Sequence, residues 1–106
     1  MIVPRKEKDL CQAALKFYGE DAQILKTIEE LNEFAVVLMH YRAKKTTEID
    51  VENELADVII MCDQMCILFG SHMKTTLEMK LTRLDKRIEQ DRLTEENNNH
   101  KWGDVL

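Results

Sequence analysis

A chain of 106 residues is long enough to bury a single hydrophobic core, and we expect one domain. Three glycines, one proline and 33% charged residues argue against a loop-rich fold or a disulfide scaffold and favour an all-α protein. The net charge of −5 and the absence of a basic stripe argue against a general nucleic-acid binder.

The first half of the chain predicts two helices. Pro4 suits the first turn of a helix that would run to Tyr18, where Gly19 can end it. Asp21 is the expected N-cap of a second helix that continues to about Ala43. The apolar positions of this second helix recur with helical spacing and are Ile24, Ile28, Leu31, Ala35 and Leu38.

The second half predicts two more helices. Asp50 is the expected cap of a third helix, which ends before Gly70. Ser71 can begin a fourth helix that lasts to about Arg92. The apolar stripe of the fourth helix consists of Leu77, Leu81, Leu84 and Ile88.

The domain is expected to span residues 1–92, and residues 93–106 are interpreted as a polar C-terminal tail. The connections between the four helices are short, and short connections place consecutive helices side by side and antiparallel. The sequence therefore predicts an all-α, four-helix antiparallel bundle.

Nothing in the sequence predicts export or a membrane span. The longest apolar stretch, residues 55–69, is interrupted by polar side chains and is too short to cross a bilayer. Residues 1–10 are charged and have no apolar region of the kind found in signal peptides. The odd number of cysteines, three, favours small core side chains in a reducing compartment over a metal or redox site. We therefore expect a cytoplasmic protein.

Four carboxylates lie beside the predicted core. Glu30 and Glu33 stand three residues apart on the second helix, and Glu54 and Asp57 do so on the third. Each pair is embedded among apolar residues, so solvent cannot relieve the repulsion between the charges. Such acids must become protonated, pair with cations or bind a metal ion.

A hard divalent cation is the ion that these four carboxylates suit best. Mg²⁺, or Mn²⁺ in its place, takes oxygen ligands and accepts carboxylate-rich, partly hydrated sites. No histidine stands at a matching position, which argues against zinc. The alternative is that each pair is only the solvated flank of an acidic helix, and spacing alone leaves this open.

A row of cations on the fourth helix supplies the complementary chemistry. Lys80, Arg83 and Arg87 point to one side of the helix, where they could grip phosphate oxygens, or form a solvated basic face. Acids that hold a metal, together with cations that hold phosphates, are the two parts of a nucleotide polyphosphate site. Gln23 lies seven residues before Glu30 and is a weak candidate for contact with a base or ribose, or else a surface polar group.

The acidic segments resemble a known signature. "EELNE", residues 29–33, followed after twenty residues by "ELAD", residues 54–57, is similar to the E-E-x-x-E and E-x-x-D motifs of the MazG-like all-α nucleoside triphosphate pyrophosphohydrolases. The flanking segments "GEDAQILKTIEELNEF" and "KLTRLDKRI" resemble short, phage-type members of that family. The similarity covers about residues 17–92, and it departs from the pattern at Asn53, where many members have an acid.

The resemblance implies a Mg²⁺-dependent enzyme. It would hydrolyse (deoxy)nucleoside triphosphates to the monophosphate and pyrophosphate, with metal-activated water attacking the α-phosphorus. The catalytic and metal-binding residues would be Glu30, Glu33, Glu54 and Asp57. Lys80 and Arg83 would bind phosphates, with Arg87 in the same row.

Two further hypotheses accompany this interpretation. A non-catalytic helical oligomerisation or binding module could use the same acids for a structural cation. Self-association into a homodimer or homotetramer is expected in either case, because residues 55–69 are apolar around the whole helix and a four-helix monomer normally hides only one side of each helix.

Overall fold

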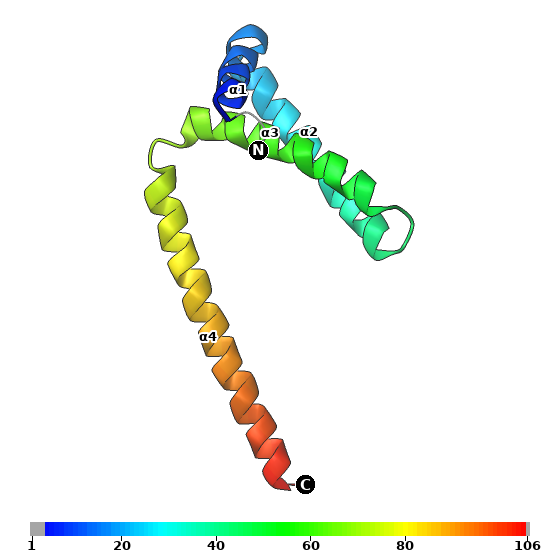
Figure 1. Cartoon of the computed structure of the whole chain (residues 1–106), viewed down its shortest axis with the longest axis vertical. Helices are drawn as coiled ribbons and strands as arrows, with labels where there is room; N and C mark the ends of the chain where they lie inside the picture. Colours follow the sequence, from blue (N-terminus) through cyan, green and yellow to red (C-terminus); the bar gives the residue numbers. More distant parts are fainter. Residues whose placement is uncertain (1–3, 106) are drawn as a thin grey trace. The chain divides into compact units, whose positions relative to one another are not determined.

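The computed structural model describes residues 4–105, in which all regular structure is helical and there is no strand (Figure 1). The four helices are α1 (Pro4–Tyr18), α2 (Glu20–Arg42), α3 (Glu48–Phe69) and α4 (Met73–Val105). The predicted all-α class is confirmed. The described residues form two compact units, one made of α1, α2 and α3 and the other of α4.

A single residue separates α1 from α2. Gly19 has φ 94° and ψ 152°, a backbone conformation that side-chain-bearing residues rarely adopt. Its N–H donates to the Leu15 carbonyl at 3.0 Å and closes α1, while its own carbonyl accepts from the Gln23 N–H at 3.2 Å and opens α2. The second helix therefore begins at Glu20, one residue before the predicted cap Asp21.

The N-terminus of α3 is capped by Thr47 instead of the predicted Asp50. The Thr47 hydroxyl accepts a hydrogen bond from the Asp50 N–H at 3.4 Å. In return, the Asp50 carboxylate accepts hydrogen bonds from the Thr46 hydroxyl and from the backbone N–H and hydroxyl of Thr47, and these bonds lower the pKa of Asp50. This reciprocal arrangement is a capping box, in which the acid stands three residues inside the helix. The other end of α3 stops before Gly70, as predicted.

Helix α4 begins at Met73 and continues beyond the predicted end at Arg92 to Val105. Arg92 bridges Glu89 at 2.6 Å and Glu96 at 2.9 Å, so one cation joins the helical turns on either side of it. The prediction ended the helix where its apolar stripe ended. An exposed helix needs no such stripe, and residues 93–105 are helical.

In the first unit, α2 and α3 run antiparallel and α1 packs against both (Figure 1). The buried apolar side chains are Cys11, Leu15, Val58 and Met61. The buried polar side chains are as numerous and are Gln23, Thr27, Glu30 and Gln64. The interior between α2 and α3 is therefore unusually polar, because the side of α2 that carries Gln23, Thr27 and Glu30 is its buried one.

The apolar stripe predicted for α2 is not the buried side of that helix. Ile28, Leu31 and Leu38 remain 50%, 45% and 42% exposed. Helical periodicity was identified correctly, but within the unit made of α1, α2 and α3 the buried side of α2 is the neighbouring polar one.

Within the described residues no single helix is long and apolar enough to cross a membrane, and only α3 and α4 taken together as an interrupted pair meet that criterion, by length and composition alone.

Candidate functional site

Three of the four predicted carboxylates lie together between α2 and α3. One oxygen from each of Glu30, Glu33 and Glu54 lies within 4.8 Å of the others, so the three could hold a metal ion. Glu30 is buried, Glu54 is half-buried and Glu33 is exposed, which makes the group open to solvent on the Glu33 side. Asp57, one turn after Glu54, is exposed and is not part of this group.

Two oxygens of this group are buried without a partner. Glu30 is only 6% exposed, and its Oε1 forms an ion pair with Lys26 Nζ at 3.0 Å. Its Oε2 has no hydrogen-bond partner among the described residues, and the same is true of Glu54 Oε2. A buried carboxylate oxygen without a partner costs free energy, so each of these two atoms requires a proton or a cation beside it.

The electrostatics of the group agree with that requirement. The pKa of Glu33 is raised, chiefly by the negative charge of Glu30, with smaller contributions from burial and from Glu54. Lys26 is the only cation paired with the group in the described part of the chain, and its pKa is raised by its hydrogen bond to Glu30. About half of the Lys26 side chain is exposed to water, which screens its charge. This single ammonium group therefore offsets only part of the repulsion among the three carboxylates.

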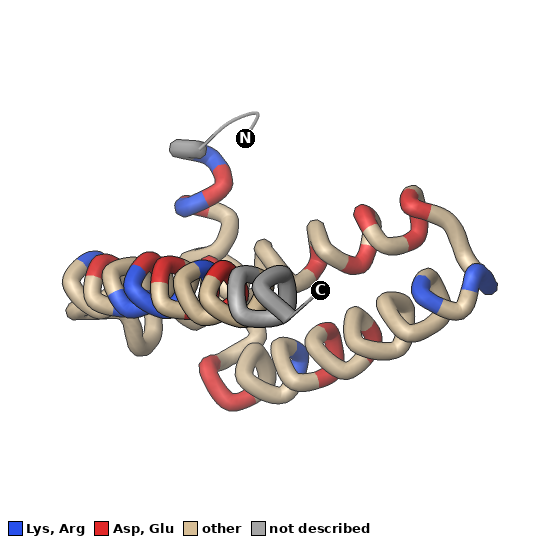
Figure 2. Tube along the Cα trace, turned by 90° about the horizontal axis from the view of Figure 1, so that it is seen from below, with Lys and Arg blue, Asp and Glu red and all other residues tan. Residues whose placement is uncertain are grey.

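The helix that carries Glu54 intensifies the negative field. Helix α3 has six acidic residues and no lysine or arginine, and the acidic segments recur along its first part in Figure 2. No cation on α3 itself can neutralise Glu54, so any compensating charge must come from another helix or from a ligand.

A shallow cavity of about 390 Å³ adjoins the carboxylates. Its lining residues come from α2 and α3 and are Asn32, Glu33, Val36, Val37, His40 and Glu54. Because Glu33 and Glu54 belong both to the acidic group and to this cavity, a ligand whose charged part meets the carboxylates has room for an uncharged part beside them.

Gln23, the weak candidate for substrate contact, is buried and already engaged. Its Nε2 donates to Gln64 Oε1 at 2.6 Å, which joins α2 to α3 through a pair of side-chain amides. The Thr27 hydroxyl donates to the Gln23 carbonyl at 2.7 Å. Sequence reasoning missed Gln64 as a partner, although its position inside the apolar run of α3 was a signal that it needs one.

The predicted cationic row lies on α4. Lys80, Arg83 and Arg87 are exposed, and at helical periodicity they occupy about one sixth of the circumference. None of them forms an ion pair within the described range, in contrast to Arg92 further along the same helix. Their charges are therefore available to a ligand or to another chain.

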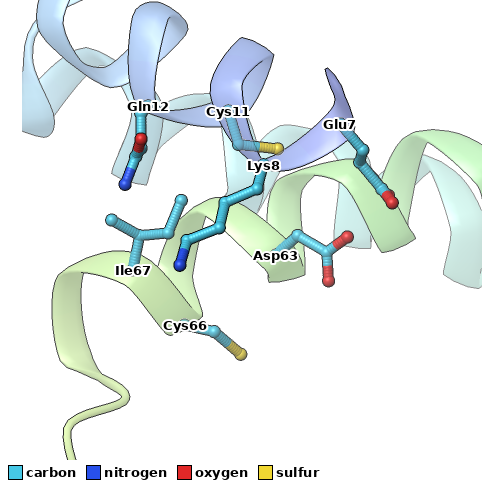
Figure 3. Close-up of a pocket in the computed structure, with 7 residues that line it drawn as sticks. All are labelled: Glu7, Lys8, Cys11, Gln12, Asp63, Cys66 and Ile67. Carbon is cyan, nitrogen blue, oxygen red and sulfur yellow. The ribbon is translucent and has the colours of Figure 1, made fainter. Parts of the chain in front are cut away.

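A second cavity, of about 450 Å³, lies between α1 and α3 and is lined by a different set of side chains (Figure 3). Glu7 of α1 and Asp63 of α3 meet there, and a hydrogen bond with Asp63 raises the pKa of Glu7. The buried Cys11 thiol donates weakly to the Ile60 carbonyl at 3.9 Å, and burial raises its pKa. Cys11 is thus a core side chain, as predicted, whereas Cys62 and Cys66 are exposed.

Comparisons of the chain with protein-family models, with curated proteins and with solved structures found no match.

Proposed function

We propose that this protein is a Mg²⁺-dependent hydrolase that converts (deoxy)nucleoside triphosphates to the monophosphate and pyrophosphate. The observation that carries the proposal is the pair of buried, unpartnered oxygens on Glu30 and Glu54, within reach of Glu33. Three convergent carboxylates that lack compensating charge form a binding site for a hard cation. Mn²⁺ fits the same donor set.

The donor set agrees with the chemistry of the reaction. When bound, Mg²⁺ polarises phosphate oxygens and lowers the pKa of a coordinated water. Glu33, exposed and with a raised pKa, is suited to accept a proton from the attacking water. Asp57, exposed one turn from Glu54, is assigned as the fourth ligand on the resemblance to the E-x-x-D motif.

Substrate binding is assigned to two further groups of residues. Lys80, Arg83 and Arg87, exposed and unpaired in the described part of α4, would neutralise the departing pyrophosphate. The cavity beside Glu33 and Glu54 would receive the nucleoside. Gln23 remains a weak candidate, because it is buried and its Nε2 already donates to Gln64.

The resemblance to the MazG-like family motivates the finer structural assignment. We propose an antiparallel bundle of the all-α nucleoside triphosphate pyrophosphohydrolase type, with residues 1–92 as the domain, that acts in the cytoplasm as a homo-oligomer. The all-helical fold and the convergence of residues from both acidic motifs support this assignment.

One observation favours a second candidate function. The Lys26 ammonium already occupies Glu30 Oε1, and Asp57 stands outside the group. A site with three ligands of this kind suits a structural cation that joins α2 to α3 in a non-catalytic binding module.

Release of pyrophosphate from a panel of ribo- and deoxyribonucleoside triphosphates, with Mg²⁺ and with chelator, tests the proposal. We expect Mg²⁺-dependent release that Glu54→Gln abolishes and that Glu52→Gln, a change of the exposed acid two residues earlier, leaves intact. Cation binding that depends on Glu54 without any release would favour the structural role. Release that is insensitive to Glu54→Gln would refute both assignments.

A further inference from the structure

Lys26 lies beside the group formed by Glu30, Glu33 and Glu54 and contacts only one of its members. The Lys26 ammonium forms an ion pair with Glu30 Oε1 at 3.0 Å and a longer one with Glu29 Oε2 at 3.8 Å. In the described part of the chain it forms none with Glu33 or Glu54. Any effect of Lys26 on a bound cation therefore acts mainly through Glu30.

The two oxygens of the Glu30 carboxylate have different surroundings. Oε1 is held by Lys26, whereas Oε2 is buried and has no partner among the described residues. A carboxylate can bind a metal ion through one oxygen while the other oxygen accepts a hydrogen bond from a neighbouring side chain. Glu30 can therefore keep its ion pair with Lys26 and still offer an oxygen to a cation.

The order of the residues along α2 places Lys26 and the cation site on opposite sides of Glu30. At 1.5 Å per residue, Lys26 precedes Glu30 by about 6 Å along the helix axis, and Glu33 follows it by about 4.5 Å. Spacings of four and three keep all three residues on one strip of the helix. A cation held by Glu30, Glu33 and Glu54 would thus have no need to displace the Lys26 ammonium.

The ion pair is sheltered at its carboxylate end. The side chain of Glu30 is 8% exposed and that of Lys26 is 48% exposed, so water reaches the ammonium more readily than the carboxylate. Lys26 is also the only cation that pairs with Glu30 in the described range. Without it, the buried carboxylate would gain free energy by turning towards solvent, and its oxygens would leave the site.

Repulsion between the ammonium and a metal ion acts in the opposite direction. Two positive charges a few ångströms apart repel each other, so charge alone predicts that removal of Lys26 strengthens cation binding. The exposed half of Lys26 weakens this repulsion, because water and salt screen it. Loss of a side chain that orients a metal ligand typically costs about 10- to 100-fold in metal affinity. The sign of the change in affinity therefore distinguishes orientation from repulsion.

We propose that Lys26 is a positioning residue, which holds Glu30 through Oε1 so that Oε2 stays available to the cation. The inference rests on cation binding by Glu30, Glu33 and Glu54, which the proposed hydrolase and the alternative structural role share. Lys26 itself contacts neither the metal ion nor the substrate.

Binding of Mn²⁺ to the full chain, followed by electron paramagnetic resonance of the free ion and repeated with Mg²⁺ as competitor, tests the inference. We expect Lys26→Met to weaken binding at least about tenfold while the helical circular dichroism is retained. Lys26→Gln, which also removes the charge, should have the same effect. Lys26→Arg keeps a cationic donor and should restore the affinity to within about threefold of the wild type.

Arg42→Met is the matched control for the loss of one positive charge. Arg42 is the only other lysine or arginine of α2, and it lies about 18 Å from Glu30 along the helix axis. Salt screens exposed charges at that separation, so we expect Arg42→Met to leave Mn²⁺ binding unchanged. An equal loss in Arg42→Met and Lys26→Met would mean that net charge governs binding, and would overturn the inference.

Two further results would overturn it. Lys26→Met and Lys26→Gln proteins that bind Mn²⁺ as tightly as the wild type, or more tightly, would show that the ammonium only competes with the metal ion. A loss that Lys26→Arg does not reduce would assign the effect to the aliphatic part of the side chain.

The same titrations separate this inference from the proposed function. A wild type that takes up no Mn²⁺ would refute both. Uptake that depends on Glu54 and on Lys26, without release of pyrophosphate from any nucleotide, would refute the hydrolase and support the role of Lys26. Release of pyrophosphate together with unchanged Mn²⁺ affinity in Lys26→Met would support the hydrolase and refute the role of Lys26.

Discussion

Glu30 on α2 and Glu54 on α3 each bury a carboxylate oxygen that has no hydrogen-bond partner in the described residues, and the two carboxylates approach within 4.8 Å. Without a cation this arrangement lowers the stability of the folded state, and with a bound cation it raises that stability. We therefore expect Mg²⁺ at about one hundred times its dissociation constant to raise the free energy of unfolding by about 2.7 kcal/mol.

Replacing Glu54 by glutamine should have opposite effects on the two forms of the protein. The metal-free variant should be more stable by about 1 kcal/mol, because the amide can donate a hydrogen bond to Glu30. Stabilisation by Mg²⁺ should disappear. Urea unfolding with and without Mg²⁺ measures both quantities, and Glu52→Gln should reproduce the wild type. A metal-free Glu54→Gln protein less stable than the wild type would contradict this reading of the site.

The cationic row of α4 should matter for turnover and not for stability. Lys80→Ala and Arg83→Ala each remove an exposed cation that the proposed function places on phosphate oxygens, and we expect roughly tenfold or larger losses in kcat/KM. Lys86→Ala removes an equally exposed cation whose direction differs from that of Lys80 by roughly 120°. Steady-state kinetics should show little change for Lys86→Ala, and equal losses for all three variants would identify the row as a solvated face.

The stability of the metal-free protein should fall as the pH rises above the pKa that carboxyl groups ordinarily have. The pKa values of Glu33 and Glu7 are raised by Glu30 and by Asp63 respectively, so the folded state binds more protons than the unfolded state above about pH 4.3. The free energy of unfolding then decreases with pH until both groups are ionised in the folded state. Asp50, whose pKa is lowered, acts in the opposite direction and only below about pH 4.

Urea unfolding at a series of pH values measures this dependence. Glu33→Gln and Glu7→Gln should each reduce the slope, since each removes one of the groups that take up a proton on folding. A stability that rises through the same range in metal-free buffer would show that the repulsion among these carboxylates is already relieved by other groups.

The amide pair that joins α2 to α3 should be strongly coupled. Gln64→Leu leaves the buried Gln23 amide without its partner, and we expect a loss of about 1 to 3 kcal/mol in the free energy of unfolding. Changing Gln23 and Gln64 to leucine together should cost much less than the sum of the single changes, because no buried polar group is left unpaired. Additive losses in this double-mutant cycle would mean that the two amides act independently. Gln12→Leu, at an exposed position, provides the reference.

The sequence predicted the helices better than it predicted which sides of them are buried. Periodicity identified the row from Ile24 to Leu38, but periodicity cannot tell whether an apolar side meets the same chain or another one. The buried side of α2 carries Gln23, Thr27 and Glu30, which a reading based on hydrophobicity assigns to solvent. These polar residues are buried because each finds a partner in Gln64, in a backbone carbonyl or in Lys26.

The candidate site was predictable to a similar degree. The three-residue spacing of the acids on two neighbouring helices predicted that Glu30, Glu33, Glu54 and Asp57 lie together, and the structure brings together the first three but not Asp57. Spacing did not reveal that Lys26, four residues before Glu30, forms an ion pair with it, since a lysine at that distance is equally compatible with a free surface side chain. The cap of α3 was misplaced for a related reason, because threonine and aspartate are both common N-caps and only the T-x-x-D pattern distinguishes their roles.

The backbone conformation of Gly19 decides whether α1 and α2 are joined by a bend or form one continuous helix. Were its backbone helical, residues 4–42 would form one uninterrupted rod nearly 60 Å long at 1.5 Å per residue, and α1 could not fold back against both α2 and α3. A Cβ atom at this position would meet nothing within 4 Å, so crowding plays no part in the requirement for glycine. The bend depends on torsional freedom alone, which makes Gly19 the point at which the chain could exchange α1 between neighbouring molecules by straightening.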